Sequence, residues 1–122
     1  MGKTSTTGQE QANPVYSGNF TATGNTVAGV LKGYWNFWIY GVFVGSVTLQ
    51  ASFDGGTTWV NASLDTAGDP ATYTTTVKVI GFEPEAGVLY RVVCGAYTSG
   101  TINWRLSGGG YGSNEGVPNG WL

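Results

Sequence analysis

The sequence predicts an all-β protein, an antiparallel β-sandwich of about eight short strands in one domain. Charged residues make up only 10% of the 122 residues, and Thr, Ser, Asn and 21 glycines take their place. Such a mixture is poor for helices and typical of short strands joined by tight turns. Hydrophobic residues reach 41%, which is enough to form a core.

Runs of β-branched and aromatic residues recur at short spacing and mark the expected strands. In chain order they are Tyr16 to Thr23, Thr26 to Lys32, Trp35 to Tyr40, Ser46 to Phe53, Thr57 to Asn61, Tyr73 to Ile80, Val88 to Ala96 and Thr101 to Ser107. The polar segment 1–14 and the Gly-rich segment 108–122 are expected to be flexible arms around a sandwich domain of residues 15–107.

Strict alternation in two of these runs predicts which side chains form the core. Apolar and polar residues take turns from Ser46 to Phe53, and again from Thr101 to Ser107. A third run has Arg91 between apolar neighbours, so its even-numbered positions are expected to point inward. The expected core residues of these runs are Val47, Leu49, Ala51, Phe53, Tyr90, Val92, Cys94, Ile102, Trp104 and Leu106.

The run from Tyr34 to Val44 is apolar on both faces, because Trp35, Phe37 and Ile39 alternate with Tyr34, Trp38 and Tyr40. A second apolar face needs cover, either from a terminal arm or from another subunit. The C-terminal arm adds aromatic and apolar side chains that could act as anchors. The candidate partner interface is therefore Tyr34, Trp38, Tyr40, Tyr111, Trp121 and Leu122.

The most specific local motif runs from Ser52 to Trp59 and places Asp54, Gly55 and Gly56 between two strands. The two glycines can take positive φ, and Asp54 can accept hydrogen bonds from the amides that follow, so a structural turn is expected. We also expect Trp59 to enter the core. The motif fits the Asp-box of sialidase-like propellers, but only one copy occurs, which favours a structural turn over a glycosidase.

The composition argues against catalysis, and we expect the protein not to be an enzyme. There is no His, so the usual general base and metal ligand are missing. A carboxylate pair for glycoside hydrolysis among Asp54, Asp65, Asp69, Glu83 and Glu85, or a calcium site at Asp65 and Asp69, has little support from spacing. No catalytic residue, metal or cofactor is predicted, and Cys94 is expected to be a buried thiol.

Charge and hydropathy exclude two classes of partner. The net charge is −2, and the five Lys and Arg residues are scattered along the chain, which is unlike a nucleic-acid-binding protein. No segment approaches the roughly 20 apolar residues of a membrane span, and the N-terminus has no apolar stretch typical of a signal peptide. We therefore expect synthesis in a cytoplasm.

Two stretches, from Val47 to Val60 and from Val88 to Ser107, resemble small virion structural proteins of tailed bacteriophages. The resemblance covers under a third of the chain. It implies a jelly-roll-like β-sandwich that assembles as a homotrimer on the outer surface of the capsid. There it would bind the major capsid protein and stabilise the shell as a decoration, or cement, protein.

The sequences of the same two stretches also fit a tail, fibre or adaptor component of the phage particle. In that alternative, surface aromatic rings of a β-sandwich such as Trp38 would bind carbohydrate by stacking on sugar rings.

Overall fold

The computed structural model describes residues 14–64 and 67–108 and forms one all-β body without helices. Its strands are β2 (Val15–Phe20), β3 (Gly24–Val30), β4 (Gly33–Tyr40), β5 (Phe43–Ser52), β6 (Val60–Asn61), β7 (Thr72–Tyr73), β8 (Val77–Glu83), β9 (Leu89–Gly100) and β10 (Ile102–Gly108).

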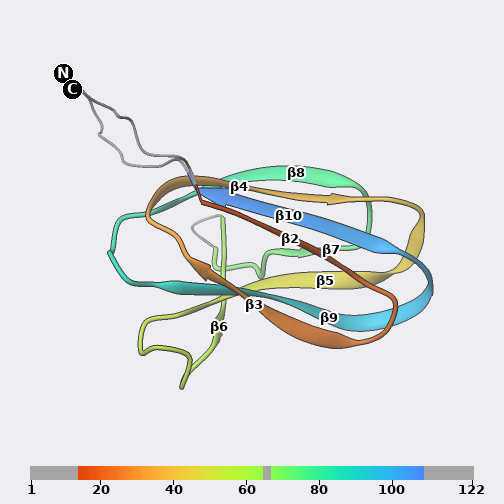
Figure 1. Cartoon of the computed structure of the whole chain (residues 1–122), viewed down its shortest axis with the longest axis horizontal. Helices are drawn as coiled ribbons and strands as arrows, with labels where there is room; N and C mark the ends of the chain where they lie inside the picture. The colour runs from red at the N-terminus through yellow and green to blue at the C-terminus, as the bar shows by residue number, and fades with distance from the viewer. Residues whose placement is uncertain (1–13, 65–66, 109–122) are drawn as a thin grey trace.

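The strands form two antiparallel sheets that pack face to face (Figure 1). The four-stranded sheet has the order β2-β10-β4-β8. The five-stranded sheet has the order β3-β9-β5-β6, and β7 also pairs with β5. Successive long strands therefore alternate between the sheets, and the last strand returns to lie between the first and the third. The predicted antiparallel β-sandwich is therefore confirmed, and its strand order resembles that of a jelly roll.

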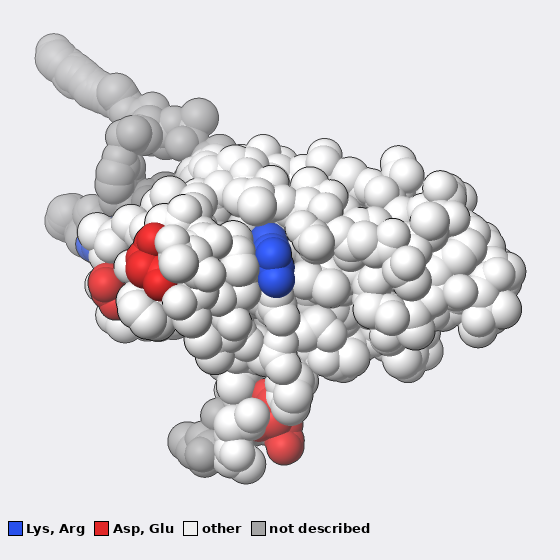
Figure 2. All heavy atoms as spheres, turned by 90° about the horizontal axis from the view of Figure 1, so that it is seen from below, with Lys and Arg blue, Asp and Glu red and all other residues white. Residues whose placement is uncertain are grey.

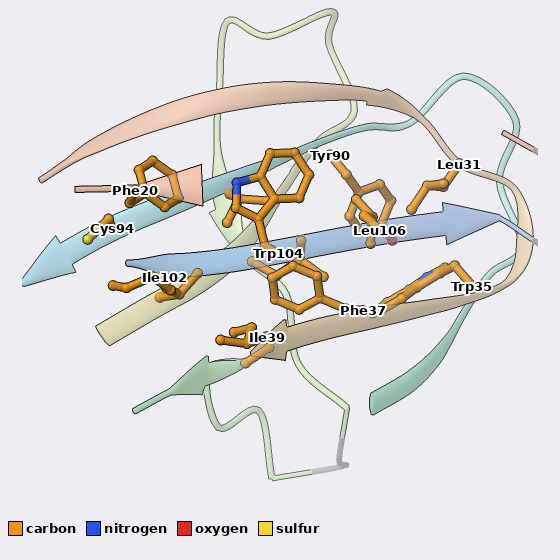
Figure 3. Packing of buried hydrophobic residues seen from close by; sticks show 14 of the residues in the cluster. Phe20, Leu31, Trp35, Phe37, Ile39, Tyr90, Cys94, Ile102, Trp104 and Leu106 are labelled. Atoms are coloured by element: carbon orange, nitrogen blue, oxygen red, sulfur yellow. The ribbon is translucent and has the colours of Figure 1, made fainter. Parts of the chain in front are cut away.

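The core lies between the sheets and consists of inward-pointing residues from both (Figure 3). Phe37 and Ile39 of β4, together with Trp104 of β10, are almost fully buried against the opposite sheet. The alternation in the sequence correctly predicts most of this set. The residues that the sequence assigned to the core and that are buried are Val47, Leu49, Tyr90, Val92, Cys94, Ile102, Trp104 and Leu106.

Two glycines in the four-stranded sheet make room for buried indole rings. A Cβ atom at Gly81 would lie 2.2 Å from Cζ2 of Trp35, and one at Gly18 would lie 3.0 Å from Cζ2 of Trp104. Trp35 also packs against Tyr90 of the opposite sheet, with ring centroids 5.6 Å apart. Each large ring is therefore accommodated by the missing side chain of a strand neighbour.

Four expectations about the core and the strands are wrong. Phe53 is 67% exposed, because β5 ends at Ser52 and the chain turns away before Phe53. Ser52, which the alternation places among the solvent-facing polar residues, is fully buried as the last residue of β5. Trp59 is only half-buried, on the outer side of the five-stranded sheet.

The fourth concerns the expected strand from Tyr73 to Ile80. It is two strands, because β7 pairs with β5 and β8 pairs with β4 in the other sheet. The chain crosses between the sheets at the bend from Thr74 to Thr76. The arms proposed from the sequence fall mainly outside the described residues.

Candidate functional site

The outer surface of the four-stranded sheet exposes a group of large apolar side chains along β4 and β8. We call this group the aromatic face; its members are Tyr34, Trp38, Tyr40, Ile80 and Phe82. Tyr34 pairs with Phe82 across the strands, and Trp38 pairs with Lys78, so these side chains point to the same side. Three of the five are candidate interface residues predicted from the sequence.

The two ends of the aromatic face differ in structure. At one end the rings of Tyr34 and Phe82 contact each other, with centroids 4.9 Å apart, and the side chains are 68% and 56% exposed. Toward the other end Trp38 is 39% exposed, and Lys78 Nζ lies 5.2 Å from the centroid of its ring. The face therefore has a bare aromatic pair and, beside it, a tryptophan with a cation next to its ring.

Hydrogen bonds fix the position of Trp38. Its Nε1 donates to Oδ1 of Asn36 at 2.9 Å, and Ser107 Oγ donates to the same oxygen at 3.2 Å. Arg105 Nη1 donates to Ser107 Oγ at 3.5 Å. Asn36 thus connects the indole to the neighbouring strand β10. The indole ring of Trp38 is held in place by these internal hydrogen bonds, without a partner protein.

The aromatic face is comparable in size to the largest apolar patch of a typical monomer. With 150–250 Å² for each aromatic side chain, the exposed fractions correspond to an apolar surface on the order of 500 Å². The largest apolar patch on a typical monomer is about 300–600 Å², and such patches often mark binding sites. A standard protein interface buries about 800 Å² on each partner. The aromatic face could therefore supply the greater part of one interface.

Both charged residues that flank Trp38 in the sheet are basic. In one row across the sheet, Trp38 lies between Arg105 of β10 and Lys78 of β8. The acidic residues that the structure describes are elsewhere: Asp54 and Asp69 lie in connections beside the other sheet, and Glu83 and Glu85 lie at the end of β8. Glu83 accepts a hydrogen bond from Tyr90 Oη at 2.7 Å, which engages it on the core side.

Figure 2 shows the molecule from the side on which β3 and β9 lie in Figure 1, and charged groups are few there. Acidic groups gather at one end and on the projection at the lower edge of this view, and a basic group lies near the middle. The low charge of the sequence thus appears as a broad neutral surface.

The predicted turn at Asp54 has the geometry that the motif indicates. Gly55 and Gly56 have φ of 76° and 101°, and Asp54 Oδ1 accepts hydrogen bonds from the amides of Thr57 and Thr58 at 3.1 and 2.8 Å. Ser52 Oγ donates to the same oxygen at 2.7 Å and accepts from the amide of Gly56 at 2.9 Å.

These hydrogen bonds lower the pKa of Asp54, and they engage the hydroxyl of the buried Ser52. The bond from the Thr58 amide, followed by that from Ser52, lowers the pKa of Asp54 from 3.8 to about 2. These hydrogen bonds of the Asp54 carboxylate all join it to residues of the same turn, so the carboxylate stabilises the turn.

Trp59 closes this turn onto the sheet in a way that the sequence did not predict. The guanidinium of Arg91 stacks on its ring, with Cζ 4.4 Å from the centroid. Arg91 Nε donates to Gln50 at 2.8 Å, and Gln50 in turn donates to Asn61 at 2.9 Å. A cation near the start of β9 therefore provides the surface on which Trp59 packs, outside the core.

The remaining chemically active groups are dispersed. Burial raises the pKa of the Cys94 thiol, whose Sγ donates to the carbonyl of Ala96 at 3.3 Å. In residues 14–64 and 67–108 no three of the His, Cys, Asp and Glu side chains come together as a metal site. The same described residues contain no helix long and apolar enough to cross a membrane.

Sequence reasoning located one strand of the aromatic face and missed the other. Ile80 and Phe82 alternate with Val79 and Gly81, so their pattern could have indicated a second exposed apolar strand. Their position beside Tyr34 and Trp38 follows from the pairing of β8 with β4, which the sequence does not contain. Of the other predicted residues, Tyr111, Trp121, Leu122 and Asp65 lie outside the described residues.

Comparison of the chain with protein-family models, with curated proteins and with solved structures found no match.

Proposed function

We propose that this protein is a non-enzymatic virion structural protein, a capsid decoration protein that binds the major capsid protein on the outer surface of the head. In this proposal it stabilises the shell as a homotrimer and is made in the cytoplasm of the host. The aromatic face is the single observation that carries the proposal, because a contiguous apolar patch of this size often marks a binding site.

Three further features support an adhesive role. Jelly-roll sandwiches recur in viral capsid proteins, although the fold alone does not assign a function. The surface has few charges that would need to be stripped of water on binding. The resemblance of two stretches, Val47 to Val60 and Val88 to Ser107, to phage virion proteins supports a place on the virus particle.

The test is co-sedimentation of the purified protein with shells that lack it, with Trp38→Ala as the variant. Trp38 exposes about 100 Å² of apolar surface, whose burial is worth about 2.5 kcal/mol, so binding should weaken by roughly sixtyfold. Phe53→Ala is the matched control, because Phe53 is at least as exposed but lies beyond the end of β5 in the other sheet.

Binding of wild type and of Phe53→Ala, with loss in Trp38→Ala, is the expected result. Absence of wild-type binding to the shells would overturn the proposal. Light scattering after size-exclusion chromatography, for the free protein and for protein released from shells, measures whether the assembly is a trimer.

A second candidate function is carbohydrate binding by a tail, fibre or adaptor component. The observation that favours it is the fixed ring of Trp38 with amide side chains nearby, since Asn103 pairs with Tyr40 on the same face. Aromatic rings stack on sugars and amides bond to their hydroxyl groups. Glycan-array binding that disappears in Trp38→Ala, without binding to shells, would select this function.

A further inference from the structure

The charges around the aromatic face indicate the chemistry of its partner. Of the basic residues that the structure describes, Lys32, Lys78, Arg91 and Arg105, two belong to the outer surface of the four-stranded sheet. The register places none of the described acidic residues there. A protein with net charge −2 therefore presents a locally positive, aromatic surface.

The two cations are placed symmetrically around Trp38. Arg105 and Lys78 both pair with Trp38, one from each neighbouring strand, so their backbones are about 5 Å from it on either side. Lys78 Nζ stays near the indole ring, and Arg105 reaches Ser107, which bonds to Asn36. An anionic group that approached the edge of Trp38 would lie within reach of both side chains.

Within residues 14–64 and 67–108, no carboxylate is paired with Arg105. Its side chain is half-buried, and its Nη1 donates a hydrogen bond to the neutral hydroxyl of Ser107 at 3.5 Å. A guanidinium remains charged at any physiological pH, and partial burial without a carboxylate is unfavourable. A carboxylate supplied by a partner would form a charge-assisted pair in a place already partly shielded from water.

The same charges argue against a second copy as the occupant. If two aromatic faces met across a two-fold axis, each would place Lys78 and Arg105 against the same basic surface of the other. Like charges brought together in an interface oppose association. Self-association of the chain is thus better served by other surfaces than by two aromatic faces in contact.

We propose that the aromatic face docks a protein surface on which carboxylates flank an exposed apolar strip, and that Lys78 and Arg105 pair with those carboxylates. This inference rests on the proposed function, and it names the chemistry of the site on the shell protein that receives the decoration protein. The apolar contact supplies affinity, and the two cations set register and orientation.

The experiment measures binding to shells for the charge-reversal variants Lys78→Glu and Arg105→Glu. Each should weaken binding at least tenfold, and binding of the wild type should weaken as salt is raised from about 0.05 to 0.5 M. Lys32→Glu is the matched control. It makes the same change of charge in the exposed connection between β3 and β4 and should bind within about twofold of wild type.

The outcomes separate this inference from the proposed function. If wild type binds and all three variants bind equally, the carboxylate partner is overturned while shell binding stands. If Lys32→Glu weakens binding as much as the other two, only net charge matters, and the local pairing is overturned. If wild type does not bind shells, both proposals fail. Thermal unfolding of each variant, with melting temperatures close to wild type, confirms that the fold is retained.

Discussion

Replacing Gly81 by Ala tests whether the sheet depends on the space beneath Trp35. The new Cβ would lie 2.2 Å from Cζ2 and 2.6 Å from Cε2 and Cη2 of an indole that is 4% exposed. Overpacking of a core costs about 1–3 kcal/mol, and an approach this close belongs at the upper end. Alanine also lowers the conformational entropy of the unfolded chain, which increases the free energy of unfolding by about 0.4–1 kcal/mol. The net loss should be about 2 kcal/mol.

Thermal unfolding followed by tryptophan fluorescence and circular dichroism measures this loss. For a domain of 60–100 residues, 1 kcal/mol shifts the melting temperature by about 4–8 °C, so Gly81→Ala should melt about 8–16 °C lower. Gly95→Ala is the control, because the nearest atom to its added Cβ is Ser46 Oγ at 4.0 Å. That variant should be as stable as wild type or slightly more stable.

A double variant identifies the cause. Combining Gly81→Ala with Trp35→Phe replaces the indole by a smaller ring, so the two changes should compensate by about 1 kcal/mol relative to their sum. Purely additive losses, or a Gly81→Ala variant that melts within about 2 °C of wild type, would refute the packing argument.

Three further predictions concern titratable groups. Because the folded pKa of Asp54 is about 2 and its ordinary value is 3.8, its contribution to stability is complete above about pH 4 and is lost as the pH falls through 2; acid unfolding of Asp54→Asn should lack this dependence. Burial, and then Glu83, raise the pKa of Tyr90, so stability should fall as the pH rises above 10. Tyr90→Phe should remove that alkaline loss and cost about 1.5–3 kcal/mol at neutral pH, as measured by denaturant unfolding. Cys94 should react with a thiol reagent only as fast as the protein opens, and rapid labelling of the folded protein would contradict its burial.

The core was predictable where local alternation and tertiary position agree. In β10 every second residue from Ile102 to Leu106 is buried, because this strand lies inside its sheet and packs on the opposite sheet along its length. In β5 the same alternation holds for Val47 and Leu49 but fails at Phe53. There the hydrogen bonds of Ser52 and Asp54 end the strand, and a periodicity continued past that point has no structural meaning.

For a similar reason, only the β4 residues of the aromatic face were predictable from the sequence, and those of β8 were not. The two-sided pattern of β4 is a local signal, and it indicates an exposed apolar face without reference to any neighbour. The contribution of β8 to this face depends on strand pairing, since Phe82 pairs with Tyr34, which is 48 residues away in the sequence. The stacking of Trp59 on Arg91 is likewise long-range, and a tryptophan in a strand-like run gives no sign that a cation will be its partner.

The first and last described strands lie side by side, and the amide of Gly108 donates to the carbonyl of Pro14 at 2.9 Å. Pro14 and Gly108 are therefore two attachment points at a single corner of the sandwich. Tension between those attachment points would separate β2 from β10 one hydrogen bond at a time, like a zipper, instead of shearing the whole pair at once. The mechanical strength of the fold under such a load is set by single ladder bonds that break in turn from that corner, and not by the buried core.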